Sequence, residues 1–291
     1  MGITLKSGGG EIKVYLHMGF PKTGSSTLQY GLLKPLENKF GLNLITWRKN
    51  GEYEHLDYRP SSRLFNFQNI GEQYLKFDKE KINIISDESL TAPLRLRQQN
   101  YGKNICSPFK FPSELKRQIE LQYPNEDINY TIFLTIRNQS KLIFSQYVEE
   151  YNWKIFKNID LLFNENGEID LDGYEIYNYS KYLNILINIF GFNSIKLTLF
   201  EDWIYEFDYF CSIISDTFNI PFGDVYLALK NNHINKKKKT SDGIYVKGNS
   251  TLVPYLNKEQ NNQIMEYYFD SNLQLANLFA IHDKLNKYHY L

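Results

Sequence analysis

Residues 12–36, IKVYLHMGFPKTGSSTLQYGLLKPL, decide the fold because they join two apolar runs through a glycine-bearing loop. The first run, Ile12 to Leu16, has the composition of a strand, and the second, Thr27 to Leu36, has apolar spacing typical of a helix. Between a strand and a helix, successive backbone N–H groups and the positive end of the helix dipole converge on the loop. The stretch therefore predicts a phosphate-binding loop.

The lysine of this loop does not lie where a nucleoside-triphosphate P-loop has it. Gly19 and Gly24 occupy the glycine positions of that motif. Ser25 occupies the lysine position, and the lysine of this loop is Lys22, three residues earlier. A kinase or ATPase needs its lysine on the β- and γ-phosphates, together with a Mg²⁺ ion. A P-loop kinase is thus an alternative function that the position of Lys22 argues against.

The segment PKTGSSTL, residues 21–28, resembles the 5′-phosphosulfate loop of sulfotransferases that use 3′-phosphoadenosine 5′-phosphosulfate (PAPS). The bacterial, carbohydrate-type branch of that family is the most similar in style. The resemblance implies that the lysine contacts the phosphate that becomes the leaving group, and that the hydroxyl residues bind the same phosphosulfate. The implied binding residues are Lys22, Thr23, Gly24, Ser25, Ser26 and Thr27. The simpler alternative is a glycine turn with a solvated lysine.

A second candidate anion site follows the strand-like run Tyr130 to Ile136. Arg137 ends that run, and Ser145 lies eight residues later in a stretch that has helical spacing. A guanidinium group can bind two phosphate oxygens, and a serine hydroxyl can bind a third. The pair resembles the motif with which the same family holds the 3′-phosphate of its nucleotide. Alternatively, the arginine caps a carbonyl group and the serine is exposed.

Two acidic residues follow a third strand-like run, Ile82 to Ser86. Ligands of an open parallel sheet bind beyond the carboxyl ends of its strands, so we expect these acids to face the same crevice. Neighbouring residues of an extended segment point to opposite sides, so one of Asp87 and Glu88 faces the ligand. We predict Glu88 as the base that deprotonates the acceptor. The alternative is that Glu88 pairs with Arg95 or Arg97.

Two further sets of residues are candidates for the site. His17 ends the first strand and is a rival base, although a buried structural histidine is the simpler interpretation. The run Lys236 to Lys239 is the densest group of like charges. The resemblance implies a late basic loop over the 3′-phosphate, within residues 231–250, and assigns nucleotide contacts to Lys237 and Lys238. The alternative is a solvated loop.

Composition limits the remaining possibilities. The chain has 291 residues with a net charge of zero, so nucleic acid is not a predicted partner and anion capture needs a local cluster of cations. The two cysteines provide neither a disulfide framework nor a metal-ligand spacing. No apolar run has the length of a membrane span, and residues 1–11 read as a polar lead. We therefore predict a cytoplasmic protein without a metal, and its oligomeric state stays open.

The order of apolar runs predicts an α/β, P-loop-like fold of three layers, with a mainly parallel sheet flanked by helices. We expect the 291 residues to form a single domain. The predicted strands lie near 12–18, 43–47, 82–86, 130–136 and 194–200. The predicted helices lie near 25–38, 62–77, 112–122, 140–153, 174–190, 203–219 and 257–283.

These observations, with the resemblance, predict a PAPS-dependent sulfotransferase acting on a hydroxyl acceptor, for which a saccharide is the expected class. Besides a kinase, the alternative is a non-catalytic protein of the same fold that binds a nucleotide or carbohydrate. The acidic and glycine-containing loop at residues 164–173 is expected to border the acceptor site.

Overall fold

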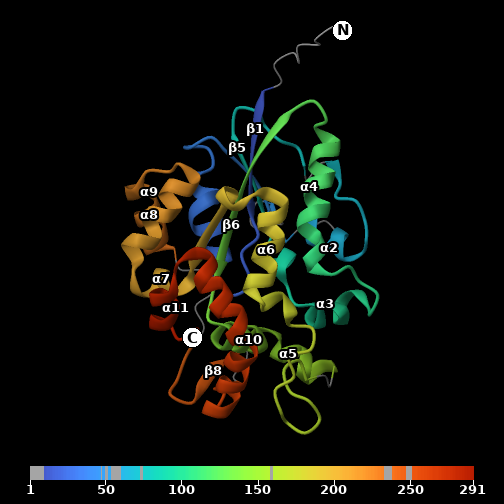
Figure 1. The fold of residues 1–291 in the computed structure, drawn as a ribbon, viewed down its shortest axis with the longest axis vertical. Helices are drawn as coiled ribbons and strands as arrows, with labels where there is room; N and C mark the ends of the chain where they lie inside the picture. Colours follow the sequence, from blue (N-terminus) through green and yellow to red (C-terminus); the bar gives the residue numbers. More distant parts are fainter. Residues whose placement is uncertain are drawn as a thin grey trace.

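A five-stranded parallel sheet with the order β2-β5-β1-β6-β7 forms the centre of the molecule in this computed structural model (Figure 1). The structure describes residues 10–46, 48–49, 52–53, 60–72, 75–157, 160–232, 238–246 and 251–291. The sheet strands are β1 (Glu11–His17), β2 (Leu42–Ile45), β5 (Ile82–Ser86), β6 (Asp127–Ile136) and β7 (Ile195–Leu199). All four pairings are parallel, which confirms the predicted α/β architecture.

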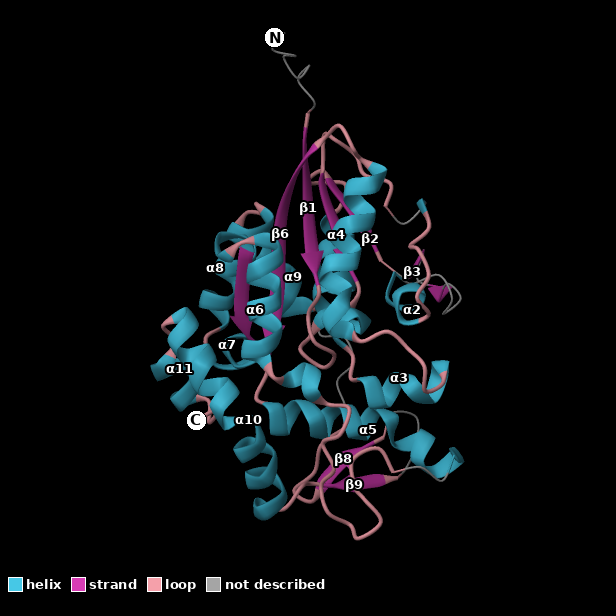
Figure 2. Ribbon diagram, turned by 45° about the vertical axis from the view of Figure 1, so that its right-hand side comes forward, coloured by secondary structure: helices cyan, strands magenta, loops and turns pink. Residues whose placement is uncertain are grey.

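Successive side chains of each strand point to opposite faces of the sheet, so the strands contribute to two apolar layers, one on each face. Ile132 and Leu134 of β6 belong to one buried cluster, whereas Phe133 between them belongs to the other. Helices cover both faces (Figure 2). The first cluster includes residues of α4 (Phe111–Gln122), α5 (Gln139–Lys157), α6 (Tyr179–Phe190) and α10 (Lys258–Phe279). The second includes residues of η1 (Thr27–Leu33), α7 (Phe200–Tyr205), α8 (Phe207–Phe218) and α9 (Phe222–Asn231).

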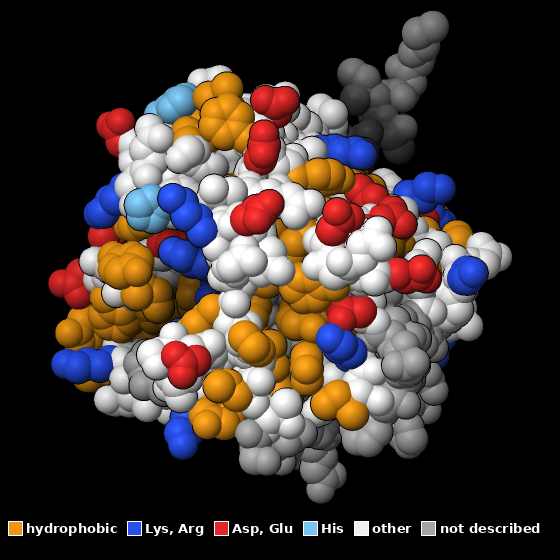
Figure 3. Space-filling model, turned by 90° about the horizontal axis from the view of Figure 1, so that it is seen from below, with side chains coloured by type: hydrophobic (Ala, Val, Ile, Leu, Met, Phe, Trp, Pro, Cys, Tyr) orange, Lys and Arg blue, Asp and Glu red, His pale blue; other side chains and the backbone are white. Residues whose placement is uncertain are grey.

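The sheet register brings the loops after the strands together at one end. His17 at the end of β1 pairs with Ser86 at the end of β5, and Ile136 pairs with Leu199 at the ends of β6 and β7. The segments that follow these strands therefore meet at the carboxyl edge, where ligands of parallel sheets bind. Figure 3 views the molecule from this end and shows hydrophobic side chains gathered beside basic and acidic ones.

Shorter elements complete the described chain. The remaining helices are α1 (Lys34–Leu36), α2 (Pro60–Phe65), η4 (Glu88–Thr91), α3 (Leu94–Tyr101), η5 (Pro108–Lys110), η6 (Glu175–Tyr177), η7 (Phe192–Ser194) and α11 (His282–Lys287). Two small antiparallel pairs are β3 (Arg48–Lys49) with β4 (Glu52–Tyr53), and β8 (Gly243–Tyr245) with β9 (Leu252–Pro254).

Several predicted helices are shorter than expected or divided. The helix expected at 62–77 is α2 alone, which ends at Phe65 before Phe67 adopts a left-handed conformation with φ 56°. The helix expected at 203–219 is α7 and α8, with a break at Glu206, whose φ and ψ are −134° and 54°. The C-terminal helix α10 begins after its capping residue Asn257 but ends at Phe279, because Ala280 adopts a left-handed conformation with φ 53°. These helices end where the local backbone conformation changes, and apolar spacing in the sequence does not encode that conformation.

Candidate functional site

A cleft of about 1100 Å³ lies at the carboxyl edge of the sheet. It is lined by segments that follow β1, β5, β6 and β7, and by residues of α5, α9 and the β8–β9 region. The charged lining residues are Lys22, Glu88, Arg137, Lys141, Glu149, Glu201, Lys230 and Lys239. The small and hydroxyl-bearing ones are Gly24, Ser25, Ser26, Thr27, Ser140 and Ser145. The cleft thus brings together most of the residues predicted from the first loop and from Arg137 and Ser145.

The first loop has the strand, loop and helix context that its sequence predicts, since β1 precedes it and η1 follows it. Lys22 and Gly24 both have positive φ, at 68° and 88°. A Cβ atom on Gly24 would lie 2.1 Å from Cζ3 of Trp203, so both the conformation and the packing require glycine there. The amide of Leu28 bonds back to the Gly24 carbonyl, which starts the helix beside the cleft.

Lys22 extends its side chain into the cleft. Its Nζ lies 3.3 Å from Oε2 of Glu149 on α5, and a quarter of its side chain is exposed. Its backbone carbonyl accepts a 2.9 Å hydrogen bond from Nη1 of Arg137. The ammonium group of the first loop and the guanidinium group after β6 are therefore parts of one site.

Arg137 lies deeper than Lys22, between the first loop and the start of α7. Its Cζ atom lies 4.7 Å from the centre of the Phe200 ring, a cation–π distance. Burial lowers the pKa of its guanidinium, and the nearby Glu201 carboxylate opposes that shift. Ser145 lines the same cleft from the second turn of α5. This is the juxtaposition of arginine and serine that the sequence predicts.

The two acids after β5 have different environments. Glu88 lines the cleft, and its carboxylate accepts a hydrogen bond from the Ser25 hydroxyl. Asp87 is buried, and its carboxylate accepts hydrogen bonds of 3.0 Å each from the amides of Ser89 and Ser61. Of the two carboxylates, Glu88 is the one that a ligand in the cleft can reach.

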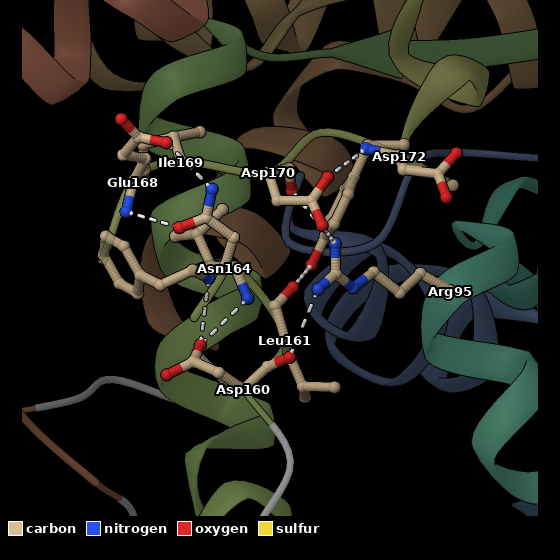
Figure 4. A network of polar contacts seen from close by, with 12 residues as sticks. Arg95, Asp160, Leu161, Asn164, Glu168, Ile169, Asp170 and Asp172 are labelled. Carbon is tan, nitrogen blue, oxygen red and sulfur yellow. Dashed lines mark hydrogen bonds and ion pairs between the residues drawn. The ribbon is translucent and has the colours of Figure 1, made fainter. Parts of the chain in front are cut away.

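The arginines considered as partners of Glu88 have contacts elsewhere. Arg95 forms a 2.6 Å ion pair with Asp170 and bonds the backbone carbonyls of Asp160 and Asp170 (Figure 4). Arg97 donates a hydrogen bond to the Ser89 hydroxyl. Arg95 thus anchors the loop at residues 164–173, which was expected to border the acceptor site.

His17 is buried beneath the loop and is not among the lining residues of the cleft. Its Nδ1 lies 2.6 Å from the Ser86 hydroxyl, which also accepts a hydrogen bond from Gln29. No described residue is a hydrogen-bond partner of its Nε2. Burial lowers the pKa of His17 from 6.5 to about 4, so the ring is neutral at pH 7. Its position fits a structural role better than proton transfer in the cleft.

The low pKa of His17 predicts a pH-dependent stability. Unfolded His17 takes up a proton near pH 6.5, whereas the folded protein resists it down to about pH 4. The free energy of unfolding should therefore fall by up to about 3 kcal/mol as the pH drops through this window. Urea unfolding at pH 7 and pH 4.5 checks this. In His17→Asn this fall in the free energy of unfolding between pH 7 and pH 4.5 should disappear, whereas a variant of the exposed His282 should keep it. An equal fall in both variants would contradict the assignment to His17.

The remaining predicted residues are placed differently. Thr23 is buried, and its hydroxyl donates to the Phe20 carbonyl at 2.6 Å, so its side chain supports the loop from within. Lys238 is exposed, and its Nζ lies 5.0 Å from the centre of the Tyr245 ring, outside the cleft lining. Lys239, the next residue, lines the cleft, whereas Lys237 lies outside the described residues.

Sequence reasoning missed several residues of the cleft. Lys230 comes from α9, which apolar spacing did not predict. Trp203, Phe207 and Tyr226 line the wall beside the first loop, on elements distant from it in sequence. The sequence offered one signal for these residues: aromatic side chains such as Phe200 follow directly after the end of β7.

The described residues contain neither a candidate metal site nor a candidate membrane-spanning helix. No group of three or more His, Cys, Asp or Glu side chains in that part of the chain could hold a metal ion. None of the helices described is long and apolar enough to cross a membrane.

Of the comparisons with known proteins, the one with solved structures gave a match. No protein-family model matches the chain, and no curated protein does. Among solved structures, the chain is similar to the crystal structure of a sulfotransferase from Alicyclobacillus acidocaldarius, at 11% sequence identity and a TM-score of 0.48. The match covers 91% of this chain and 94% of that one.

Proposed function

We propose that this protein is a sulfotransferase that moves the sulfuryl group of PAPS to a hydroxyl acceptor. One observation carries the proposal: two sets of side chains that can bind anions, from different segments of the chain, line a single cleft. Lys22 and the hydroxyls of its loop form one set, and Arg137 with Ser145 forms the other. A nucleotide that has phosphate groups on both its 3′ and 5′ positions needs two such sets.

In this mechanism the first loop binds the 5′-phosphosulfate. Lys22 and the backbone amides before η1 stabilise the negative charge that grows on the 5′-phosphate as it leaves. Arg137 and Ser145 hold the 3′-phosphate and so fix the nucleotide. Because the chain is neutral overall, these local cations, with Lys141, must attract the donor.

The transfer itself is an in-line displacement at sulfur. The acceptor oxygen forms a bond to sulfur while the bond from sulfur to the 5′-phosphate oxygen breaks. Glu88 takes the acceptor proton, and its hydrogen bond from Ser25 orients the carboxylate toward the loop. His17 is the less suitable base because it is buried and does not line the cleft.

The acceptor class and location stay predictions from the sequence. Tyr255 and Phe144 line the cleft with their ring centres 5.6 Å apart, and aromatic rings can pack on sugar rings as well as on a nucleobase. A saccharide hydroxyl is the proposed acceptor, and the cytoplasm is the proposed compartment.

The test compares thermal stabilisation by adenosine 3′,5′-bisphosphate with that by ATP and Mg²⁺. At a hundredfold excess over Kd, the bisphosphate should raise Tm by roughly 4–5 °C. The shift should be absent in Arg137→Ala and unchanged in Arg117→Ala, an exposed arginine that pairs with Glu114. Stabilisation by ATP and Mg²⁺ alone would favour a kinase. Bisphosphate binding without PAPS turnover would favour a non-catalytic binding protein.

A further inference from the structure

The residues behind Arg137 form a buried polar network that includes the C-terminal segment, residues 288–291. Glu201, in the first turn of α7, is only 3% exposed. One of its carboxylate oxygens accepts a hydrogen bond from the backbone amide of Asn138 at 3.1 Å. The other accepts from the hydroxyl of Tyr290 at 2.9 Å. Tyr290 thus supports the carboxylate that holds the residue next to Arg137.

A second contact joins the same two segments through the backbone. The side-chain amide of Asn138 donates to the carbonyl of His289 at 2.7 Å. The side-chain oxygen of Asn138 accepts a hydrogen bond from the backbone amide of Lys141, and this contact caps the start of α5. The C-terminal segment therefore fixes both the residue that follows Arg137 and the beginning of the helix that carries Ser145.

A third contact holds the C-terminal segment itself. Asn272 of α10 donates to the carbonyl of Tyr290 at 3.0 Å. Its side chain also exchanges two hydrogen bonds, of 2.7 and 3.1 Å, with the amide of Gln139. Because these groups are buried, each hydrogen bond is shielded from competition with water. Tyr290 consequently lies in a fixed position relative to the start of α5.

We propose that Tyr290 and Glu201 are positioning residues for the 3′-phosphate subsite, an inference that rests on the proposed function. Glu201 holds the Asn138 amide and places a buried negative charge close to the guanidinium of Arg137. Tyr290 keeps that carboxylate in place. Removing the Tyr290 hydroxyl loosens Arg137 and α5, and so weakens recognition of the 3′-phosphate more than recognition of the 5′-phosphate.

The test measures the Kd of adenosine 3′,5′-bisphosphate and of AMP, which lacks the 3′-phosphate. In Tyr290→Phe the Kd of the bisphosphate should rise about tenfold, since one buried hydrogen bond to a charged group is lost, and the Kd of AMP should change less than about twofold. Tyr288→Phe is the matched control, because the Tyr288 hydroxyl donates to Asp202, the neighbour of Glu201. Unfolding temperatures without ligand show whether both variants fold.

The outcomes separate this inference from the function on which it rests. If the unmodified protein binds the bisphosphate no better than AMP, the proposed function is wrong and the inference falls with it. If the unmodified protein prefers the bisphosphate and Tyr290→Phe keeps the full preference, the inference alone is wrong. An equal loss of preference in Tyr288→Phe would also overturn it, because a general effect on stability would then explain both.

Discussion

Lys22→Met is expected to lower kcat for sulfuryl transfer at least about a hundredfold, with little change in Tm. The ammonium group is the cation of the first loop, and its side chain reaches the cleft where the 5′-phosphate is proposed to bind. Removing one preorganised group that stabilises a developing negative charge typically costs a factor of this size. The fold should persist, because Arg137 bonds the backbone carbonyl of Lys22, which the substitution leaves in place.

Glu149→Gln is the control that separates the two roles of this lysine. It removes the charge that pairs with Lys22 at 3.3 Å and leaves the ammonium group available to a phosphate. Since exposed ion pairs contribute about 1 kcal/mol or less to stability, Glu149→Gln should keep both the fold and most of the activity. Initial rates with PAPS and thermal unfolding of both variants provide the comparison. Equal losses of kcat in the two variants would contradict phosphate binding by Lys22.

The sequence predicted the parts of the fold that depend on local pattern. Continuous apolar runs such as residues 130–136 identify buried parallel strands, and β6 contains that run. The glycine loop after β1 was equally predictable, because its residue types are those that an anion-binding turn requires. The positions of Arg137 after a strand and of Ser145 in the following helix were also predictable, because the strand end and the helix fix their spacing.

The residues that sequence reasoning missed depend on contacts between distant segments. Trp203 packs on Gly24, and Tyr290 reaches Glu201, across separations that no local pattern records. The sequence analysis chose Glu88 over Asp87, but the physical reason that Asp87 does not line the cleft came only from the structure. Alternation showed that only one could face the ligand, but the amide of Ser61, far from both in sequence, holds Asp87 inside. Tertiary contacts, rather than residue type, decide such positions.

Glu88→Gln is expected to lower kcat about a thousandfold while nucleotide binding persists. The substitution keeps the size of the side chain and an oxygen that can accept from Ser25, but glutamine cannot take the proton of the acceptor hydroxyl. Loss of a general base typically costs a factor of 10²–10⁴. This variant should therefore bind the bisphosphate normally while its kcat falls. Calorimetry measures the binding, and initial rates with PAPS measure kcat.

Asp87→Asn is the matched control, since it makes the same chemical change at the adjacent carboxylate. Asp87 accepts from two backbone amides, and an asparagine NH₂ group would face one of them, so this variant should lose about 1–3 kcal/mol of stability. Its kcat below the unfolding transition should stay within about tenfold of the original, because Asp87 is buried beside the cleft rather than lining it. Loss of kcat in Asp87→Asn with full activity in Glu88→Gln would reverse the two assignments. Loss in neither would move the base to another residue and leave Glu88 as a binding group for the loop.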